Sequence, residues 1–118
     1  MEIKNICENE AVNIAYSALD DKKGIDIKVI NIENVSVIAD YFIITSGSNV
    51  NQVKALADNV QEELNKAGYD YKQIEGYNTA NWILMDYGNI IIHIFNQDDR
   101  LFYDLERIWR DGKIIETE

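Results

Sequence analysis

The chain has 118 residues, of which 47% are hydrophobic, and it carries a formal net charge of −10 at pH 7. This length suits one domain with one hydrophobic core, and the apolar fraction excludes an intrinsically disordered chain. The acidity argues against direct nucleic-acid binding, which needs clustered Lys and Arg. It either favours a basic protein partner or serves solubility alone.

A helix and a strand are predicted in the first quarter of the chain. Between Asn5 and Lys23, apolar residues recur at intervals of three and four, which is typical of an amphipathic helix. Gly24 is expected to end this helix in a left-handed cap. Apolar and polar residues then alternate imperfectly over Ile25–Ile32, so this strand is expected to be partly covered on both faces.

A second strand and a second helix are expected after a short connector. The segment Tyr41–Ser46 is apolar on both faces, as in the central strand of a sheet. Gly47 and Ser48 interrupt it, and Asn49–Ala67 then carries its apolar residues along one helical stripe that ends at Gly68. A strand, a tight turn and a helix in this order form half of a crossover unit.

The most informative stretch is a predicted hairpin. A polar strand within Tyr69–Tyr77 precedes it, and the strands Trp82–Met85 and Ile90–Phe95 then meet at a tight Tyr-Gly-Asn turn. Positions 82, 84 and 86 share one face of the first strand, which leaves Ile83 and Met85 for the core. The hairpin is therefore expected to present a Trp and a carboxylate on one face.

The last predicted element is a helix with Asp98 or Asp99 as its N-cap. The whole order of helices and strands is α, β, β, α, β, β, β, α, which predicts one α/β domain over residues 1–118 with a mixed sheet of about five strands flanked by helices. A short polar tail is expected from about residue 110. The apolar side of the last helix comprises Leu101, Phe102, Leu105, Ile108 and Trp109.

An enzymatic site is weakly supported. Gly47 and Ser48 lie where backbone amides hold a phosphate in nucleotidyltransferases, but such enzymes also need paired carboxylates on a neighbouring strand to bind metal. Asp58 and Glu62 are one turn apart on the solvent side of the predicted helix, and no strand carries a second pair. The Gly-Ser pair is more simply an ordinary connection from strand to helix.

One His and one Cys are too few for a metal cluster, and they lie far apart in the sequence. His93 in a strand is more typical of a hydrogen-bonded structural residue than of a catalytic base. Cys7 is expected on the buried side of the first helix and has no partner for an intramolecular disulfide.

With no signal peptide and no apolar run that could span a bilayer, the expected location is the cytoplasm, with no cofactor, no metal and no membrane contact.

Six blocks of sequence occur in one order between about Asn5 and Asp111. They are DYFIITSGS at 40–48, QVKALAD at 52–58, EG at 75–76, NWILMDYG at 81–88, His93, and Arg100 followed by FYDLE at 102–106 with Trp109. Together they resemble the ribosome silencing factor family, which is related to Iojap. The chain departs from the family at Asn89, where members usually have Asp.

The resemblance implies a fold similar to a nucleotidyltransferase core that has lost its catalytic carboxylates, and a protein that is not an enzyme. It also implies a translational repressor that binds the large ribosomal subunit on its intersubunit face. The contact would run through the basic large-subunit protein conventionally counted fourteenth, with little direct nucleic-acid contact. Such binding blocks joining with the small subunit when nutrients are limiting.

Two alternatives are a degenerate nucleotidyltransferase-like nucleotide-binding domain and an acidic adaptor for some other basic protein. A homodimer through an exposed sheet edge or helix face is also compatible with the sequence.

The hairpin face is the expected contact surface for the ribosomal partner. Trp82 and Leu84 would supply apolar contacts, and Asp86 would supply a carboxylate facing Lys or Arg of the partner, with Tyr87 at the turn. His93, Asp58 and Tyr103 are lesser candidates for the same contact.

Overall fold

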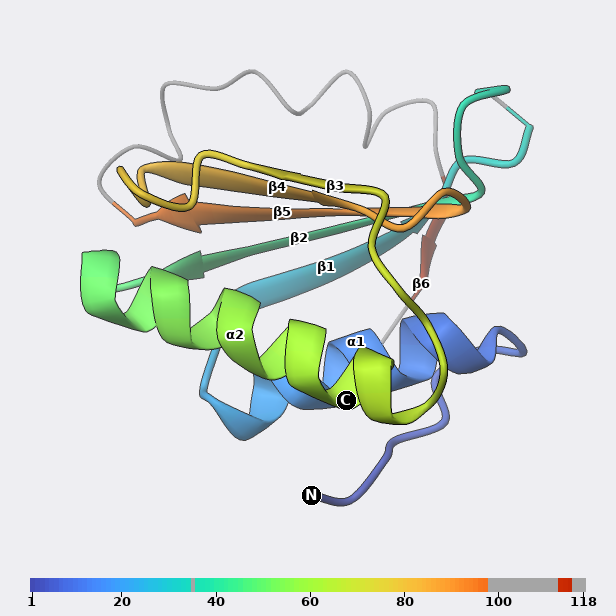
Figure 1. The fold of residues 1–118 in the computed structure, drawn as a ribbon. Coiled ribbons are helices and arrows are strands. Elements are labelled where there is room, and N and C mark those ends of the chain that lie inside the picture. Colours follow the sequence, from blue (N-terminus) through green and yellow to red (C-terminus); the bar gives the residue numbers. More distant parts are fainter. Residues whose placement is uncertain (35, 98–112, 116–118) are drawn as a thin grey trace.

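A six-stranded mixed sheet, with two helices on one face, is formed by the residues that the computed structural model describes, which are 1–34, 36–97 and 113–115 (Figure 1). The strand order is β3-β4-β5-β2-β1-β6. The pair β2 and β5 is parallel, and every other neighbouring pair is antiparallel. The strands are β1 Ile25–Asn31, β2 Tyr41–Gly47, β3 Gln73–Glu75, β4 Trp82–Asp86, β5 Ile90–Asn96 and β6 Lys113–Ile115.

Helix α1 spans Glu10–Asp21 and therefore begins later than the expected Asn5. The side chain of Asn9 caps it by accepting a hydrogen bond from the Val12 amide at 3.1 Å. Before the cap, the Asn13 side chain accepts hydrogen bonds from the amides of Ile6 and Cys7, so this segment follows a path outside the helix. Cys7 consequently lies before α1 and is half-buried, whereas the sequence had placed it on the helix.

The end of α1 also differs from the expectation. Lys23 adopts the left-handed conformation, with φ of 61°, that the sequence assigns to Gly24. Gly24 is needed for close approach instead, because a Cβ there would lie 2.8 Å from Thr45 Oγ1. The local sequence identifies Gly24 as a special position, but the glycine is required there by the close approach of β2 and not by a left-handed conformation.

Helix α2 spans Val50–Lys66 and agrees with the predicted stripe. Asn49 caps its start, since Oδ1 accepts a hydrogen bond from the Gln52 amide at 3.0 Å. Gly68 follows its end with φ of +92°, and the Tyr69 amide donates to the Leu64 carbonyl at 2.9 Å. The predicted end of this helix at Gly68 is confirmed, and the glycine adopts the left-handed conformation of a C-terminal cap.

The hydrophobic core lies mainly between the sheet and the helices. Figure 1 shows α1 and α2 side by side beneath the sheet, and residues of both helices pack with Ile43 of β2, Ile83 of β4 and Ile92 of β5. A smaller cluster on the opposite face contains Ile44 of β2 and Phe95 of β5. Strand β2 is therefore buried on both faces, as expected for a central strand.

The C-terminal part of the chain contains one correction and one prediction that stays open. Residues 113–115 form β6, which pairs antiparallel with β1, although a polar tail is expected from about residue 110. A three-residue strand is too short to show periodicity, and only pairing with β1 identifies it. The predicted closing helix and Tyr103 lie outside the described residues.

Candidate functional site

The hairpin of β4 and β5 separates its side chains onto two faces. Ile83 and Met85 are fully buried against the helices, as the alternation predicts. The opposite face, here called the outer face, carries Trp82, Leu84 and Asp86 on β4. Their cross-strand neighbours on β5 are Phe95, His93 and Ile91, respectively.

Trp82 is held within a group of aromatic rings on the outer face. Its indole Nε1 donates a hydrogen bond to His93 Nδ1 at 3.0 Å. The indole stacks on Phe95 at a centroid distance of 5.3 Å and lies tilted against the His93 ring at 5.8 Å. Trp82 is nevertheless 36% exposed, so an aromatic surface remains for a partner.

His93 is only 6% exposed, so it offers a partner very little surface of its own. Phe42 contacts it edge-on with ring centroids 5.2 Å apart, and the Phe95 ring is stacked beside it. Burial lowers the pKa of His93 from 6.5 to about 4. The imidazole is therefore neutral at physiological pH and can accept the Trp82 hydrogen bond.

Asp86 shapes the turn of the hairpin as well as contributing charge. Its Oδ1 accepts a hydrogen bond from the Gly88 amide at 2.8 Å, and Gly88 has φ of +89°. The Tyr87 amide closes the same turn by donating to the Ile90 carbonyl. The other oxygen of Asp86, Oδ2, makes no hydrogen bond or ion pair with a described side chain. One carboxylate oxygen thus fixes the turn, and the second has no hydrogen bond to a described side chain.

Glu75 is a carboxylate of the outer face that sequence reasoning missed. The pairing of β3 with β4 sets Glu75 opposite Leu84 and Gln73 opposite Asp86, so both residues lie on the outer face. Glu75 is exposed and accepts a hydrogen bond from the Gln73 side chain. Alternation around Ile74 indicated that these two residues share a face, but their register against β4 requires the folded sheet.

The other expected contact residues lie elsewhere. Tyr87 packs against the core on the helical side of the sheet, with its ring edge-on to Tyr71. Its hydroxyl is buried without a hydrogen bond to any described residue, and burial raises its pKa to about 12. Asp58 lies on α2 and accepts a hydrogen bond from the Tyr77 hydroxyl at 2.9 Å. The structure therefore brings together Trp82, Leu84, Asp86 and His93 but not these two.

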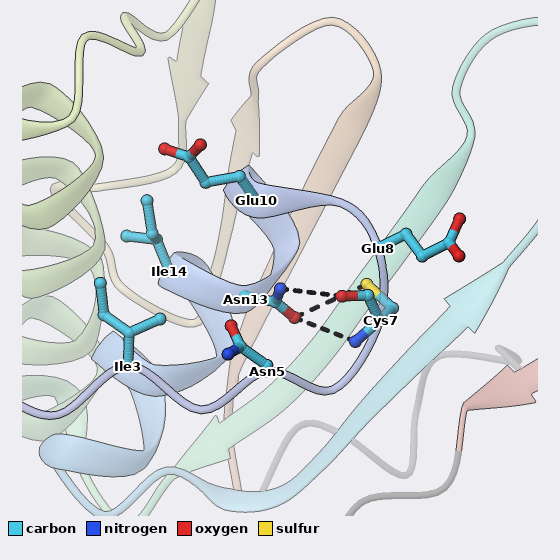
Figure 2. Close-up of a pocket in the computed structure, with 7 residues that line it drawn as sticks. All are labelled: Ile3, Asn5, Cys7, Glu8, Glu10, Asn13 and Ile14. Carbon is cyan, nitrogen blue, oxygen red and sulfur yellow. Dashed lines mark hydrogen bonds between the residues drawn. The ribbon is translucent and has the colours of Figure 1, made fainter.

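A surface hollow of about 510 Å³ lies beside the start of α1, away from the outer face (Figure 2). Asn13 projects into this region, but its oxygen accepts from the Cys7 amide and its nitrogen donates to the Cys7 carbonyl. The polar atoms of Asn13 therefore hold the N-terminal segment. The other polar side chains that line the hollow are those of Asn5, Glu8 and Glu10.

A family model described as "Ribosomal silencing factor during starvation" matches residues 6–118. The chain belongs to this family of ribosomal silencing factors. The predicted resemblance is confirmed, and the family is named for regulation rather than for catalysis.

Relatives and solved structures agree with membership of the silencing factor family. A protein of Halalkalibacterium halodurans named ribosomal silencing factor RsfS is 37% identical over 109 residues, which cover 92% of this chain and 93% of the relative. A crystal structure from Bacillus halodurans matches with a TM-score of 0.82 at 33% identity, covering 92% of this chain and 98% of the other. A mouse protein named mitochondrial assembly of ribosomal large subunit protein 1 is 28% identical, covering 83% of this chain and 44% of the mouse protein.

In this family member, the Gly-Ser turn after β2 serves the packing of α2. A Cβ at Gly47 would lie 2.9 Å from Val53, so the glycine lets the helix approach the strand. The amide and hydroxyl of Ser48 both donate to Gln52 Oε1, at 2.6 and 2.8 Å. The Ser48 amide that a phosphate would need is thus already satisfied within the chain. The likeness to a nucleotidyltransferase core stays a prediction.

In the described part of this silencing factor family member, no group of three or more His, Cys, Asp or Glu residues is arranged to hold a metal ion. Neither α1 nor α2 is long and apolar enough to cross a membrane.

Proposed function

We propose that this protein is a cytoplasmic translational repressor that binds the large ribosomal subunit on its intersubunit face. The contact runs through the basic large-subunit protein conventionally counted fourteenth, and it blocks joining with the small subunit when nutrients are limiting. Family membership supports a ribosomal role, and the name of the mouse relative refers to the large subunit. The mechanism is steric and requires no chemistry.

The observation that carries this proposal is the composition of the outer face. Trp82 and Leu84 form its apolar part, and the exposed Glu75 and the half-buried Asp86 add negative charge beside them. A central aromatic residue bordered by polar groups is the usual arrangement of a protein interface. Both carboxylates can pair with Lys or Arg, so the face fits a basic protein better than a nucleic acid.

The net charge of −10 supports the same partner. Long-range attraction between an acidic protein and a basic one raises the association rate, and this effect weakens as salt screens the charges. Apolar contacts through Trp82 respond much less to salt. The proposal therefore predicts an association rate that falls with ionic strength and a complex that persists once formed.

The test is to add the purified protein to separated ribosomal subunits, at two salt concentrations, and to follow sedimentation and the yield of joined ribosomes. We expect comigration with the large subunit and fewer joined particles as the protein concentration rises. Comigration with the small subunit, or no comigration at low salt, would overturn the proposal. Bovine serum albumin, another acidic protein, controls for charge alone.

The site of contact needs a separate arm of the same experiment. The purified large-subunit protein counted fourteenth, immobilised at low density, should bind the wild-type chain directly. Binding to the whole subunit without binding to this protein would keep the repressor function and overturn the named partner.

A further inference from the structure

Trp82 and His93 are joined across β4 and β5 by the hydrogen bond from Nε1 to Nδ1 and by contact between their rings. We propose that His93 is a positioning residue, which holds the Trp82 indole in the orientation that binds the partner. This inference rests on the proposed function, because it assigns Trp82 to the contact surface. It gives His93 a role through Trp82 rather than a contact of its own.

The protonation state of His93 follows from the hydrogen bond. An indole N–H can only donate, so Nδ1 of His93 must carry the lone pair and the proton of the neutral imidazole must lie on Nε2. Nε2 is buried and makes no hydrogen bond to the described residues. A buried donor without a partner is unfavourable, so packing alone does not explain a His at this position.

Phenylalanine would be the simpler residue for packing here. Among the described residues, the rings in contact with His93 are those of Phe42, Trp82 and Phe95. Its partners on the neighbouring strands, Leu84 and Ile44, are aliphatic. None of these side chains needs a hydrogen-bond donor from position 93. What His93 adds to a phenyl ring is one acceptor, and that acceptor is used by Trp82. Because a neutral imidazole carries its proton on the other nitrogen, an acceptor at Nδ1 implies an N–H at Nε2, which has no partner among the described residues.

Trp82 needs such a restraint because it lies at the first position of β4 and is partly exposed. Stacking on Phe95, with 26° between the ring planes, fixes the plane of the indole but permits the ring to turn over. The bond to His93 selects one of the two edges, since only one edge carries Nε1. An anchor that is already oriented loses less conformational entropy on binding.

The test compares His93→Phe, which keeps a ring and removes the acceptor, with His93→Asn, which retains an acceptor oxygen near the position of Nδ1. The first readout is the indole N–H signal of ¹⁵N-labelled protein, assigned with Trp82→Phe because the chain contains two Trp residues. We expect His93→Phe to fold, and its Trp82 signal to shift upfield and exchange faster with solvent. His93→Asn should retain most of the protection against exchange.

The second readout is affinity for the large ribosomal subunit. His93→Phe should weaken binding about twofold to tenfold, as expected when one side chain loses its bound orientation, and His93→Asn should restore part of the affinity. Trp82→Ala tests whether Trp82 itself contributes to binding. Should His93→Phe fail to fold, His93→Asn and His93→Gln supply the comparison, because only the asparagine places its oxygen near Nδ1.

The outcomes separate this inference from the proposed function. An unchanged indole signal in His93→Phe, or unchanged affinity while Trp82→Ala binds weakly, would overturn the positioning role and leave the outer face as the contact surface. Unchanged affinity in both His93→Phe and Trp82→Ala would overturn the positioning role together with the proposed face. A wild-type protein that binds no large subunits would overturn the proposed function and, with it, the inference.

Discussion

Along β4, Ile83 and Met85 are fully buried against the helices, whereas Trp82 and Leu84 lie on the other face beside carboxylates and a buried His. The inner residues are aliphatic and carry no side-chain hydrogen-bonding group that must be satisfied. On the outer face, Trp82 is partly exposed, and Nε2 of His93 has no hydrogen-bond partner among the described residues. The inner face of β4 therefore serves packing alone, whereas its outer face also carries an exposed aromatic surface and polar atoms that packing does not require.

The greatest loss of stability is expected from a substitution on the inner face. Met85→Ala removes a fully buried side chain, and we expect the free energy of unfolding to fall by about 2–5 kcal/mol. Urea denaturation followed by circular dichroism measures this loss. Leu84→Ala on the outer face is the matched control and should cost clearly less, because Leu84 is only partly buried. Equal losses at both positions would contradict the distinction between the faces.

The next prediction concerns the stability that is lost in acid when His93 is protonated. Its pKa of about 4 lies below the ordinary 6.5, so the unfolded chain takes up a proton more readily than the native state. The contribution to stability is complete above pH 6.5 and is lost as the pH falls towards 4, by up to about 3 kcal/mol. Among the described residues, the rings in contact with His93 are Phe42, Trp82 and Phe95, and none of the three titrates in this pH range.

Other carboxylates also affect stability in acid, and His93→Phe separates them from the histidine. Urea titrations at several pH values between 4 and 7 should show a shallower loss of stability in the variant than in the wild-type protein. Parallel curves for the two proteins would mean that folding does not lower the pKa of His93.

Trp82→Ala is the largest expected effect on binding with a folded protein. Truncating an aromatic anchor commonly costs about 2 kcal/mol or more, so affinity for the large subunit should fall about thirtyfold or more. Sedimentation against a range of subunit concentrations measures the change. Tyr71→Ala is the control, since Tyr71 is an exposed aromatic residue that lies against Tyr87 away from the outer face.

The smallest expected effect comes from the charge of Glu75, which the pairing of β3 with β4 brings to the outer face. Glu75→Gln should weaken binding about twofold to fivefold at low salt, as for an exposed ion pair, and this difference should shrink at high salt. Glu62→Gln makes the same change at an exposed position on α2. Equal effects of the two substitutions would indicate that net charge matters and the position of Glu75 does not.

Features of the site that depend on neighbouring residues in the chain could be predicted from the sequence. Strict alternation placed Ile83 and Met85 in the core and Trp82, Leu84 and Asp86 on the opposite face, and the glycine turn identified the hairpin. Helix α2 was also predictable, because its stripe, its cap at Asn49 and its end at Gly68 are all local signals.

Features that depend on the register between distant segments became visible only in the folded sheet. Pairing of β3 with β4 brings Glu75 to the outer face, and pairing of β1 with β6 makes a strand of residues 113–115. The bond between Trp82 and His93 likewise requires the exact offset of β4 against β5. Periodicity assigns each residue to a face of its own strand, but it does not say which residue of another strand lies opposite. That choice is made by packing of the whole sheet against α1 and α2.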